Sequence, residues 1–208
     1  MKKTTFENSE ETNRTFINDI YDWFDIIISA IVVIVLLFTF VFKIVGVDGS
    51  SMERTLHGGT NDVSAAHADR LIISNMFYTP KNGDIVVISR NHNNVAASDT
   101  EGPIIKRVIA TEGQTVDIDF DRGKVIVDGK ELDEPYVSSP IVQHDVEFPL
   151  VVDEGKIFVL GDNREVSLDS RSSEIGLVDT RYVLGKALCR IFPLGEFGSI
   201  YKQTAVTE

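Results

Sequence analysis

Hydrophobic residues follow two patterns along this chain, and the first is a single long apolar run. Residues 26–42 read IIISAIVVIVLLFTFVF, in which only Ser29 and Thr39 are polar. Both hydroxyls can hydrogen-bond to carbonyls of their own helix, so a membrane tolerates them. Counted outward to Trp23 and Val45, the segment is about 23 residues or roughly 34 Å long as a helix, enough to cross a bilayer. The pattern predicts one transmembrane helix.

A cleavable secretory signal is the competing interpretation of this run. The run is longer than the usual apolar core of a signal peptide, and no small-x-small cleavage site follows it directly. A retained anchor is therefore predicted. Charge leaves its orientation open, because the preceding residues carry both signs. They are Lys2, Lys3 and Arg14 against Glu7, Glu10, Glu11, Asp19 and Asp22.

The second pattern begins after the apolar run and is typical of β-strands. Short β-branched runs alternate with turn residues, and no convincing amphipathic helix interrupts them. A mainly β domain is therefore predicted. The expected strands lie in residues 70–74, 84–89, 103–110, 124–129, 150–152, 156–160 and 182–192.

Turn residues support consecutive hairpins in the middle of this domain. Asp128-Gly129 suits a tight hairpin that needs positive φ angles, and Asp-Arg-Gly at residues 121–123 is a similar signal. We therefore treat residues 114–155 as an accessory hairpin segment. Residues 58–69 and 91–102 are rich in small and polar side chains and are predicted to be loops.

Composition narrows the class of partner. The 208 residues are 43% hydrophobic and 25% charged, and the formal net charge of −12 argues against a nucleic-acid partner.

The single cysteine, Cys189, cannot form an intramolecular disulfide and lies in an apolar-rich stretch, so a buried structural role is expected. No two of the four histidines have metal-ligand spacing, so no metal site is predicted. They are His57, His67, His92 and His144.

Four short segments carry residue types that suggest chemistry, although each would be ordinary alone. A serine before a methionine is common, Lys-Arg pairs are usually solvated, and Gly-Asp-Asn is frequent in turns. In chain order the segments are VDGSSMERTL (47–56), GDIV (83–86), KRV (106–108) and GDNR (161–164) continuing through Ser167, Asp169 and Arg171.

Together, and in this order behind one apolar run, these segments resemble the boxes of bacterial type I signal peptidases. The resemblance extends to about Phe192, and Asp128-Gly129 with residues 134–136 is similar to Gram-positive members. It implies a membrane-bound serine endopeptidase without a cofactor. The implied fold is a β-barrel-type catalytic domain, related to that of the self-cleaving SOS repressors.

The resemblance assigns the nucleophile to Ser51 and the general base to Lys106. No histidine is placed to serve as base, and a neutral lysine amine can remove a serine proton. Strand alternation alone gives Lys106 and Arg107 equally apolar neighbours, so it leaves the choice open. Lowering a lysine pKa from about 10.4 to about 8 requires roughly 3 kcal/mol, which burial can supply. Lys106 is therefore expected to be buried.

Supporting roles are implied for further residues of the same boxes. The Ser167 hydroxyl should hydrogen-bond the Lys106 amine, and Asp169 should pair with Arg171 or Arg107. The Ser51 N–H is the implied oxyanion donor. Gly49 stands where many Gram-negative members have a serine donor, as Gram-positive members commonly do, and Arg54 departs from the proline that is usual at its position.

Substrates implied by the resemblance are preproteins whose signal peptides end in a small-x-small site. The family binds this site as an added strand, with shallow apolar pockets for the small side chains. Met52, Ile104 and Ile105 are the predicted pocket residues. Because Ser51 follows Val45 by six residues, it should lie within about 20 Å of the helix end, near the bilayer.

The predicted organisation has three parts. Residues 1–22 form an N-terminal tail, residues 23–45 the transmembrane helix, and residues 46–208 the peptidase domain. The resemblance implies that the tail is cytoplasmic and that the peptidase domain is extracytoplasmic, at the cell membrane. The expected partners are preprotein signal peptides and the lipid bilayer. The oligomeric state and the identity of the preproteins stay open.

Three other functions compete with this interpretation. A self-cleaving SOS-repressor-type peptidase is disfavoured by the apolar run and by the missing DNA-binding domain. A signal-peptidase-like assembly factor for a surface structure such as a pilus gains some support from Arg54. A membrane-tethered β binding module would leave the four segments unexplained.

Overall fold

The structure is a computed structural model that describes residues 3–59, 67–89, 102–137, 139–143 and 145–201, with side chains described from residue 21 onward. The chain divides into two compact units, residues 1–42 and 43–208. Most of the two predicted loops, together with His92 and His144, lies outside the described residues.

The first unit is dominated by one long helix, α1 (Lys3–Phe40). Its part from Tyr21 to Phe40 has a mean hydropathy of 2.6, and by length and composition it can cross a membrane. As expected for a polar residue in such a helix, the Thr39 hydroxyl donates to the Val35 carbonyl at 2.7 Å. The predicted C-terminal limit at Val45 is wrong, because residues 42–46 form a strand.

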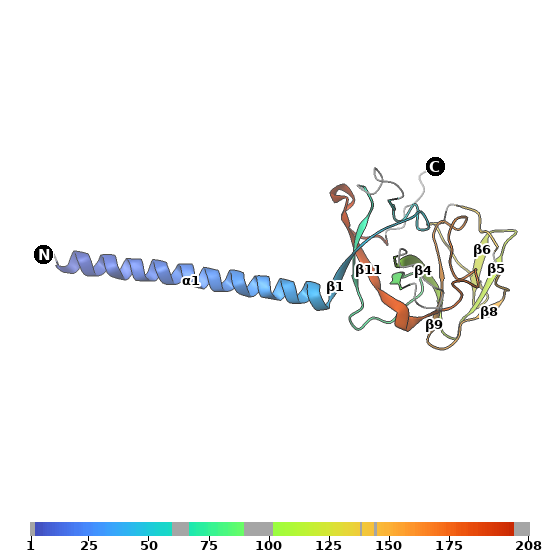
Figure 1. Cartoon of the computed structure of the whole chain (residues 1–208), viewed down its shortest axis with the longest axis horizontal. Helices are drawn as coiled ribbons and strands as arrows, with labels where there is room; N and C mark the ends of the chain where they lie inside the picture. The colour runs from blue at the N-terminus through green and yellow to red at the C-terminus, as the bar shows by residue number, and fades with distance from the viewer. Residues whose placement is uncertain (1–2, 60–66, 90–101, 138, 144, 202–208) are drawn as a thin grey trace. The chain divides into compact units, whose positions relative to one another are not determined.

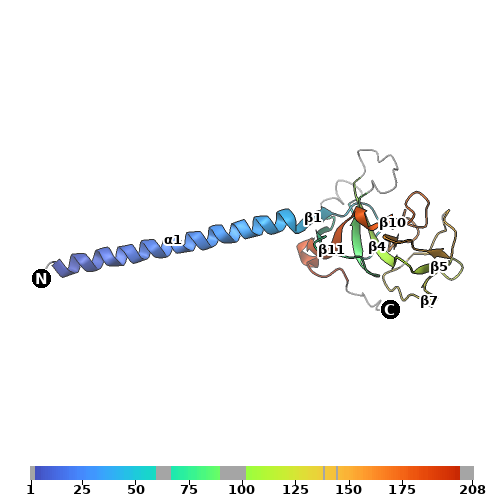
Figure 2. The ribbon, with the colours of Figure 1, turned by 90° about the horizontal axis from the view of Figure 1, so that it is seen from below.

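The second unit is mainly β, as predicted, and its larger sheet is strongly curled (Figures 1 and 2). Seven strands run in the spatial order β1-β2-β11-β3-β4-β9-β10. Their bounds are β1 (Phe42–Gly46), β2 (Arg70–Ser74), β3 (Ile85–Ile88), β4 (Ile104–Thr111), β9 (Lys156–Leu160), β10 (Val178–Asp179) and β11 (Val183–Phe192).

The smaller sheet has four strands and falls within the 114–155 segment. It runs in the order β7-β6-β5-β8. Asp128 and Gly129, with φ of 52° and 77°, make the tight turn between β6 and β7, as the Asp-Gly signal predicts. The strands are β5 (Thr115–Asp119), β6 (Lys124–Val127), β7 (Lys130–Glu131) and β8 (Leu150–Val151).

Two short 3-10 helices flank β11, η2 (Thr180–Tyr182) before it and η3 (Leu194–Glu196) after it. Cys189, near the end of β11, is partly buried, whereas full burial was expected.

Three hydrophobic clusters hold the second unit together. One lies under the smaller sheet and one against the β3–β4–β9 part of the larger sheet. The third joins β2, β3 and β11 to the segment that follows β1 through Met52, Leu56, Leu71 and Ile73. This last cluster fixes a turn of the chain, residues 50–56, which contains Ser51.

Candidate active site

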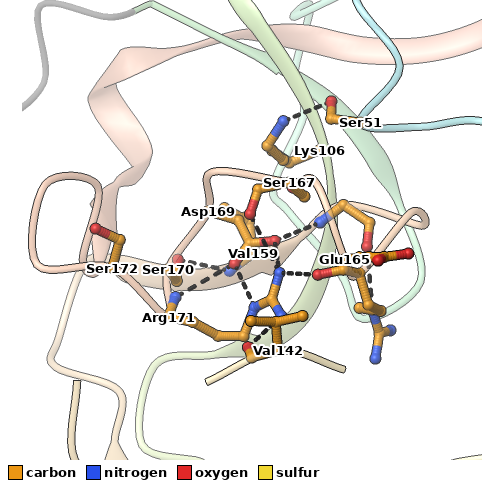
Figure 3. Close-up of polar contacts among 12 residues, drawn as sticks. Ser51, Lys106, Val142, Val159, Glu165, Ser167, Asp169, Ser170, Arg171 and Ser172 are labelled. Atoms are coloured by element: carbon orange, nitrogen blue, oxygen red, sulfur yellow. Dashed lines mark hydrogen bonds and ion pairs between the residues drawn. The ribbon is translucent and has the colours of Figure 1, made fainter. Parts of the chain in front are cut away.

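The structure brings Ser51 and Lys106 into contact. Lys106 lies near the middle of β4, opposite Val86 of β3, and its Nζ donates to Ser51 Oγ at 2.8 Å (Figure 3). Ser51 belongs to the 50–56 turn, and Lys106 lies 55 residues further along the chain. Only 3% of Lys106 is exposed. A hydroxyl and an amine at this separation can exchange a proton directly.

The Lys106 amine has a backbone acceptor, and its strand is rich in buried apolar residues. Nζ also donates to the Ile105 carbonyl at 3.2 Å. On β4 the buried neighbours are Ile104, Ile105 and Val108. Removal from water disfavours the charged ammonium form, which is the condition a lysine base requires.

Arg107, the other basic residue of this strand, faces a different partner. Its guanidinium binds the Asp162 carboxylate with two hydrogen bonds, from Nε at 2.8 Å and from the terminal nitrogen at 2.6 Å. The Tyr136 ring covers the guanidinium at 3.8 Å. Burial, together with the neighbouring Glu134, raises the pKa of Tyr136, so this phenol stays neutral. The structure thus separates the two basic residues that strand alternation left equivalent.

The Ser51 turn is tied to the loop after β9. The Asn163 backbone N–H donates to the Ser51 carbonyl at 3.0 Å, and its side-chain amide donates to the Ser50 carbonyl at 3.2 Å. Gly161 allows the close approach of this loop. A Cβ on Gly161 would lie 2.2 Å from Ser167 Oγ and 2.5 Å from the Ser51 carbonyl oxygen.

Ser167 lies beside this pair, but the predicted hydrogen bond to Lys106 is not formed. Its side chain is 1% exposed, and among the described residues its Oγ has no hydrogen-bond partner. The described hydrogen bonds of the Lys106 amine go to Ser51 and to the Ile105 carbonyl instead.

Asp169 pairs with Arg171, the first of its two predicted partners. Both side chains are fully buried, and the guanidinium binds the carboxylate at 2.8 and 2.9 Å (Figure 3). Arg171 also donates to three carbonyls, and Asp169 accepts the Gly161 N–H at 3.0 Å. The pair therefore fixes the loop that contains Ser167. The three carbonyls are those of Val142, Arg164 and Ser167.

A cleft of about 710 Å³ opens at Ser51 and Lys106. Ile104 and Ile105, two of the three predicted pocket residues, line this cleft together with Val166, Leu168 and Ile175. Met52 does not belong to this lining. It is 2% exposed and packs in the cluster with Leu56, so the structure gives no support to a pocket role for Met52.

One edge of β4 is open at the cleft. In the described part of the sheet, pairing of β4 with β9 starts at Arg107, opposite Leu160, whereas pairing with β3 already starts at Ile104. Among the described strands, none pairs with residues 104–106 on the side that faces β9 further along β4. An extended peptide can add to such an edge.

A family model described as signal peptidase, peptidase S26, matches residues 20–192 of this chain. The chain belongs to the signal peptidase family. It is therefore a serine endopeptidase of the class that removes signal peptides.

Two relatives that are named signal peptidases agree with this assignment. The chain is 34% identical to signal peptidase I of Bacillus licheniformis, over 90% of this chain and 97% of that protein. It is 31% identical to signal peptidase I T of Bacillus subtilis strain 168, over 91% of this chain and 94% of that protein. A crystal structure of a signal peptidase I from Enterococcus faecalis V583 aligns with a TM-score of 0.41 and 29% identity, covering 52% of this chain and 97% of that chain.

Gly49 and Arg54, which flank Ser51 in the sequence, both have positive φ angles. Gly49 lines the cleft with φ of 74°, and its N–H donates to Asp48 Oδ1 at 2.9 Å. Arg54 is exposed and has φ of 76°, a value that a proline ring cannot adopt. The backbone of this turn therefore excludes the proline that the pattern would place there.

Arg54→Pro should destabilise the enzyme by more than about 1 kcal/mol, because proline cannot take the positive φ of this position. Arg54→Gly should leave the free energy of unfolding unchanged or raise it by up to about 1 kcal/mol, since glycine adopts this φ without strain. Urea unfolding followed by circular dichroism measures both, with Arg54→Ala as the matched control. A proline variant as stable as the parent would show that the turn has another backbone.

Several contributors to the site were not predicted from the sequence. Thr55 donates from its hydroxyl to Asp162 Oδ2 at 2.5 Å, and Arg190 donates to the Thr55 carbonyl at 2.6 Å. Arg190 is 135 residues from Thr55 along the chain, so no local pattern signals their contact. Tyr136, over Arg107, was noted only as part of the family resemblance.

The described residues include one group of side chains that could hold a metal ion. Donor atoms of His57, Asp69 and Glu196 lie within 4.8 Å of one another. The group is separate from the residues that line the Ser51 cleft. Its members are far apart in sequence, which is why histidine spacing did not reveal it.

Proposed function

We propose that this signal peptidase cleaves preproteins by direct attack of Ser51, with Lys106 as the general base. The observation that supports this most strongly is the 2.8 Å contact between Lys106 Nζ and Ser51 Oγ at the floor of an open cleft. The amine is buried, whereas the hydroxyl is partly exposed to the cleft where a substrate would bind.

The proposed reaction has two steps. Neutral Lys106 takes the Ser51 proton while Oγ forms a bond to the scissile carbonyl carbon. The carbonyl oxygen becomes an oxyanion, which the Ser51 N–H stabilises. Collapse of the intermediate breaks the C–N bond, and the Lys106 ammonium returns its proton to the leaving amine. In the second step Lys106 activates water, which hydrolyses the acyl-enzyme ester and restores Ser51.

The open edge of β4 is the proposed binding site for the signal peptide. An extended segment along residues 104–106 would place alternate side chains toward the apolar lining formed by Ile104 and Ile105. The Gly102 and Pro103 backbone continues this wall. Small residues at the first and third positions before the cut would fit such a shallow lining.

The apolar helix supports a membrane-anchored enzyme, and we further propose that the N-terminus is cytoplasmic and the peptidase domain extracytoplasmic. Ten residues, 41–50, separate Phe40, at the end of α1, from Ser51 along the chain. A preprotein held in the same bilayer by its own apolar segment meets the enzyme at a raised effective concentration. Protease protection of the peptidase domain in sealed vesicles tests the orientation.

The pH profile of cleavage tests the assignment of the base. The rate should rise with pH, because only neutral Lys106 accepts the Ser51 proton. The midpoint should lie well below about 10.4, the ordinary value for lysine, since burial disfavours the ammonium form. Cleavage of a preprotein with an Ala-x-Ala site by the full chain in detergent, from pH 6 to 10, measures it. A flat profile, or an inert enzyme, would contradict the proposal.

A further inference from the structure

A second buried ionic group contacts the 50–56 turn, in addition to the loop after β9. Asp69 directly precedes β2 and is 1% exposed, and Arg190 lies on β11 opposite Leu71 and is 9% exposed. Arg190 Nε lies 3.0 Å from Asp69 Oδ2, as an ion pair without the alignment of a hydrogen bond. The pair therefore bridges the two strands beneath the turn.

The two terminal nitrogens of Arg190 bind the turn and the segment that follows β11. One terminal nitrogen donates to the Thr55 carbonyl at 2.6 Å, and the other binds the Glu196 carboxylate in η3. The Thr55 hydroxyl is meanwhile held by Asp162 at 2.5 Å. Thr55 is thus fastened at both its backbone and its side chain, four residues after Ser51.

Asp69 fastens the chain on either side of this turn. Its carboxylate accepts the His57 N–H at 2.9 Å, and its backbone N–H donates to the His57 carbonyl at 2.9 Å. Its backbone carbonyl accepts the Val47 N–H at 2.8 Å. Asp69 therefore binds both ends of the segment from Val47 to His57, which contains Ser51. Arg190 forms an ion pair with Asp69.

The candidate metal ligands belong to this same group, but the cation present there is a guanidinium. Arg190 already contacts the carboxylates of Asp69 and Glu196, so a metal ion would have to displace it. Burial, the strongest influence, raises the pKa of Asp69, while the His57 N–H and Arg190 act in the opposite direction. Without Arg190 the buried carboxylate would lack its compensating charge.

We propose that Arg190, oriented by Asp69 and Glu196, is a positioning residue that holds Ser51 at the Lys106 amine through the Thr55 carbonyl. The inference deepens the proposed function and rests on it. A serine and its base act at full rate only when their geometry is kept, and a shift of about 1 Å can lower a rate roughly 100-fold. Arg190 does not contact Ser51 and acts through the turn.

The test compares Arg190→Gln and Arg190→Lys with the parent enzyme as full chains in detergent, using an Ala-x-Ala preprotein. Active sites are counted with a serine-directed acylating inhibitor, so kcat refers to folded enzyme alone. We expect kcat of Arg190→Gln to fall about 10- to 100-fold with KM within about twofold, because only the position of Ser51 changes. Arg190→Lys keeps the positive charge but has a single nitrogen in place of the guanidinium's separate donors. Its kcat should therefore lie between those of Arg190→Gln and the parent. Arg181→Gln, at an exposed pair with Asp179, is the matched control and should behave as the parent.

Three results would overturn the inference. The first is parental kcat per titrated site in Arg190→Gln, which would reduce Arg190 to a structural role. The second is a loss confined to KM, which would place Arg190 in substrate binding. The third is ZnCl₂ binding to the parent that His57→Ala abolishes, which would make the group a metal site. If Ser51→Ala also cleaved the preprotein, the proposed function itself would fail, and the two failures are therefore distinguishable.

Discussion

Lys106→Met is expected to lower kcat for an Ala-x-Ala preprotein by roughly 10³- to 10⁴-fold while the fold is retained. Methionine fills a similar volume in the buried site but cannot accept the Ser51 proton across the 2.8 Å contact. Ser51→Ala should be equally inactive, and the double variant no worse than either, because the two side chains act as a unit. Single-turnover cleavage in detergent measures all three.

Two further variants separate the role of base from that of charge. Lys106→Arg places a permanent cation beside Ser51 that cannot accept a proton, so it should be as inactive as the methionine variant. Lys124→Met makes the same substitution at a partly exposed lysine that pairs with Glu131 in the smaller sheet. It should retain parental kcat. Activity in Lys106→Arg above about one tenth of the parent would show that Lys106 contributes charge alone.

Arg171→Met should cost about 3–5 kcal/mol in the free energy of unfolding, the largest stability effect we expect from one substitution. The change leaves the Asp169 carboxylate buried without its partner and also releases three backbone carbonyls. Urea unfolding followed by the β-sheet circular dichroism signal measures it. Cleavage should fall as well, because the loop that contains Ser167 loses its support.

The matched control for this loss is Arg181→Met, which breaks an ion pair of the same type at the surface. Arg181 is 82% exposed and binds Asp179 at 2.7 Å, so the expected cost is below about 1 kcal/mol. Equal losses in the free energy of unfolding in the two arginine variants would mean that burial of the Asp169–Arg171 pair adds nothing to its contribution to stability.

The β architecture was predictable because its determinants are local. Alternating β-branched runs and Asp-Gly turns specify strands and hairpins over a few residues, as at Asp128-Gly129, and the strands that they indicated are present in the structure. The candidate pair was available only through the resemblance. Periodicity could not choose between Lys106 and Arg107, since both faces of β4 are buried.

The sequence-based predictions that failed share a physical cause: the features concerned depend on contacts between segments that are distant along the chain. Residues 42–46 are apolar enough to extend α1, yet pairing with β2 makes them a strand. The burial of Met52 and the tie from Arg190 to Thr55 arise from β2 and β11, which lie far along the chain. The expected bond of Ser167 to Lys106 depended on a hydroxyl direction that sequence does not encode.

Both faces of β4 are apolar, so hydrophobic burial alone does not fix the register of this strand. Ile104, Ile105, Val108 and Ile109 are all buried, so hydrophobic burial would tolerate the strand displaced by one residue. The binding of Arg107 to Asp162 is what such a displacement would lose. A guanidinium would then sit at Ser51, where it cannot accept a proton, and the strand would remain fully packed. Arg107 thus fixes the register of β4, and with it the position of Lys106, the proposed base, beside Ser51.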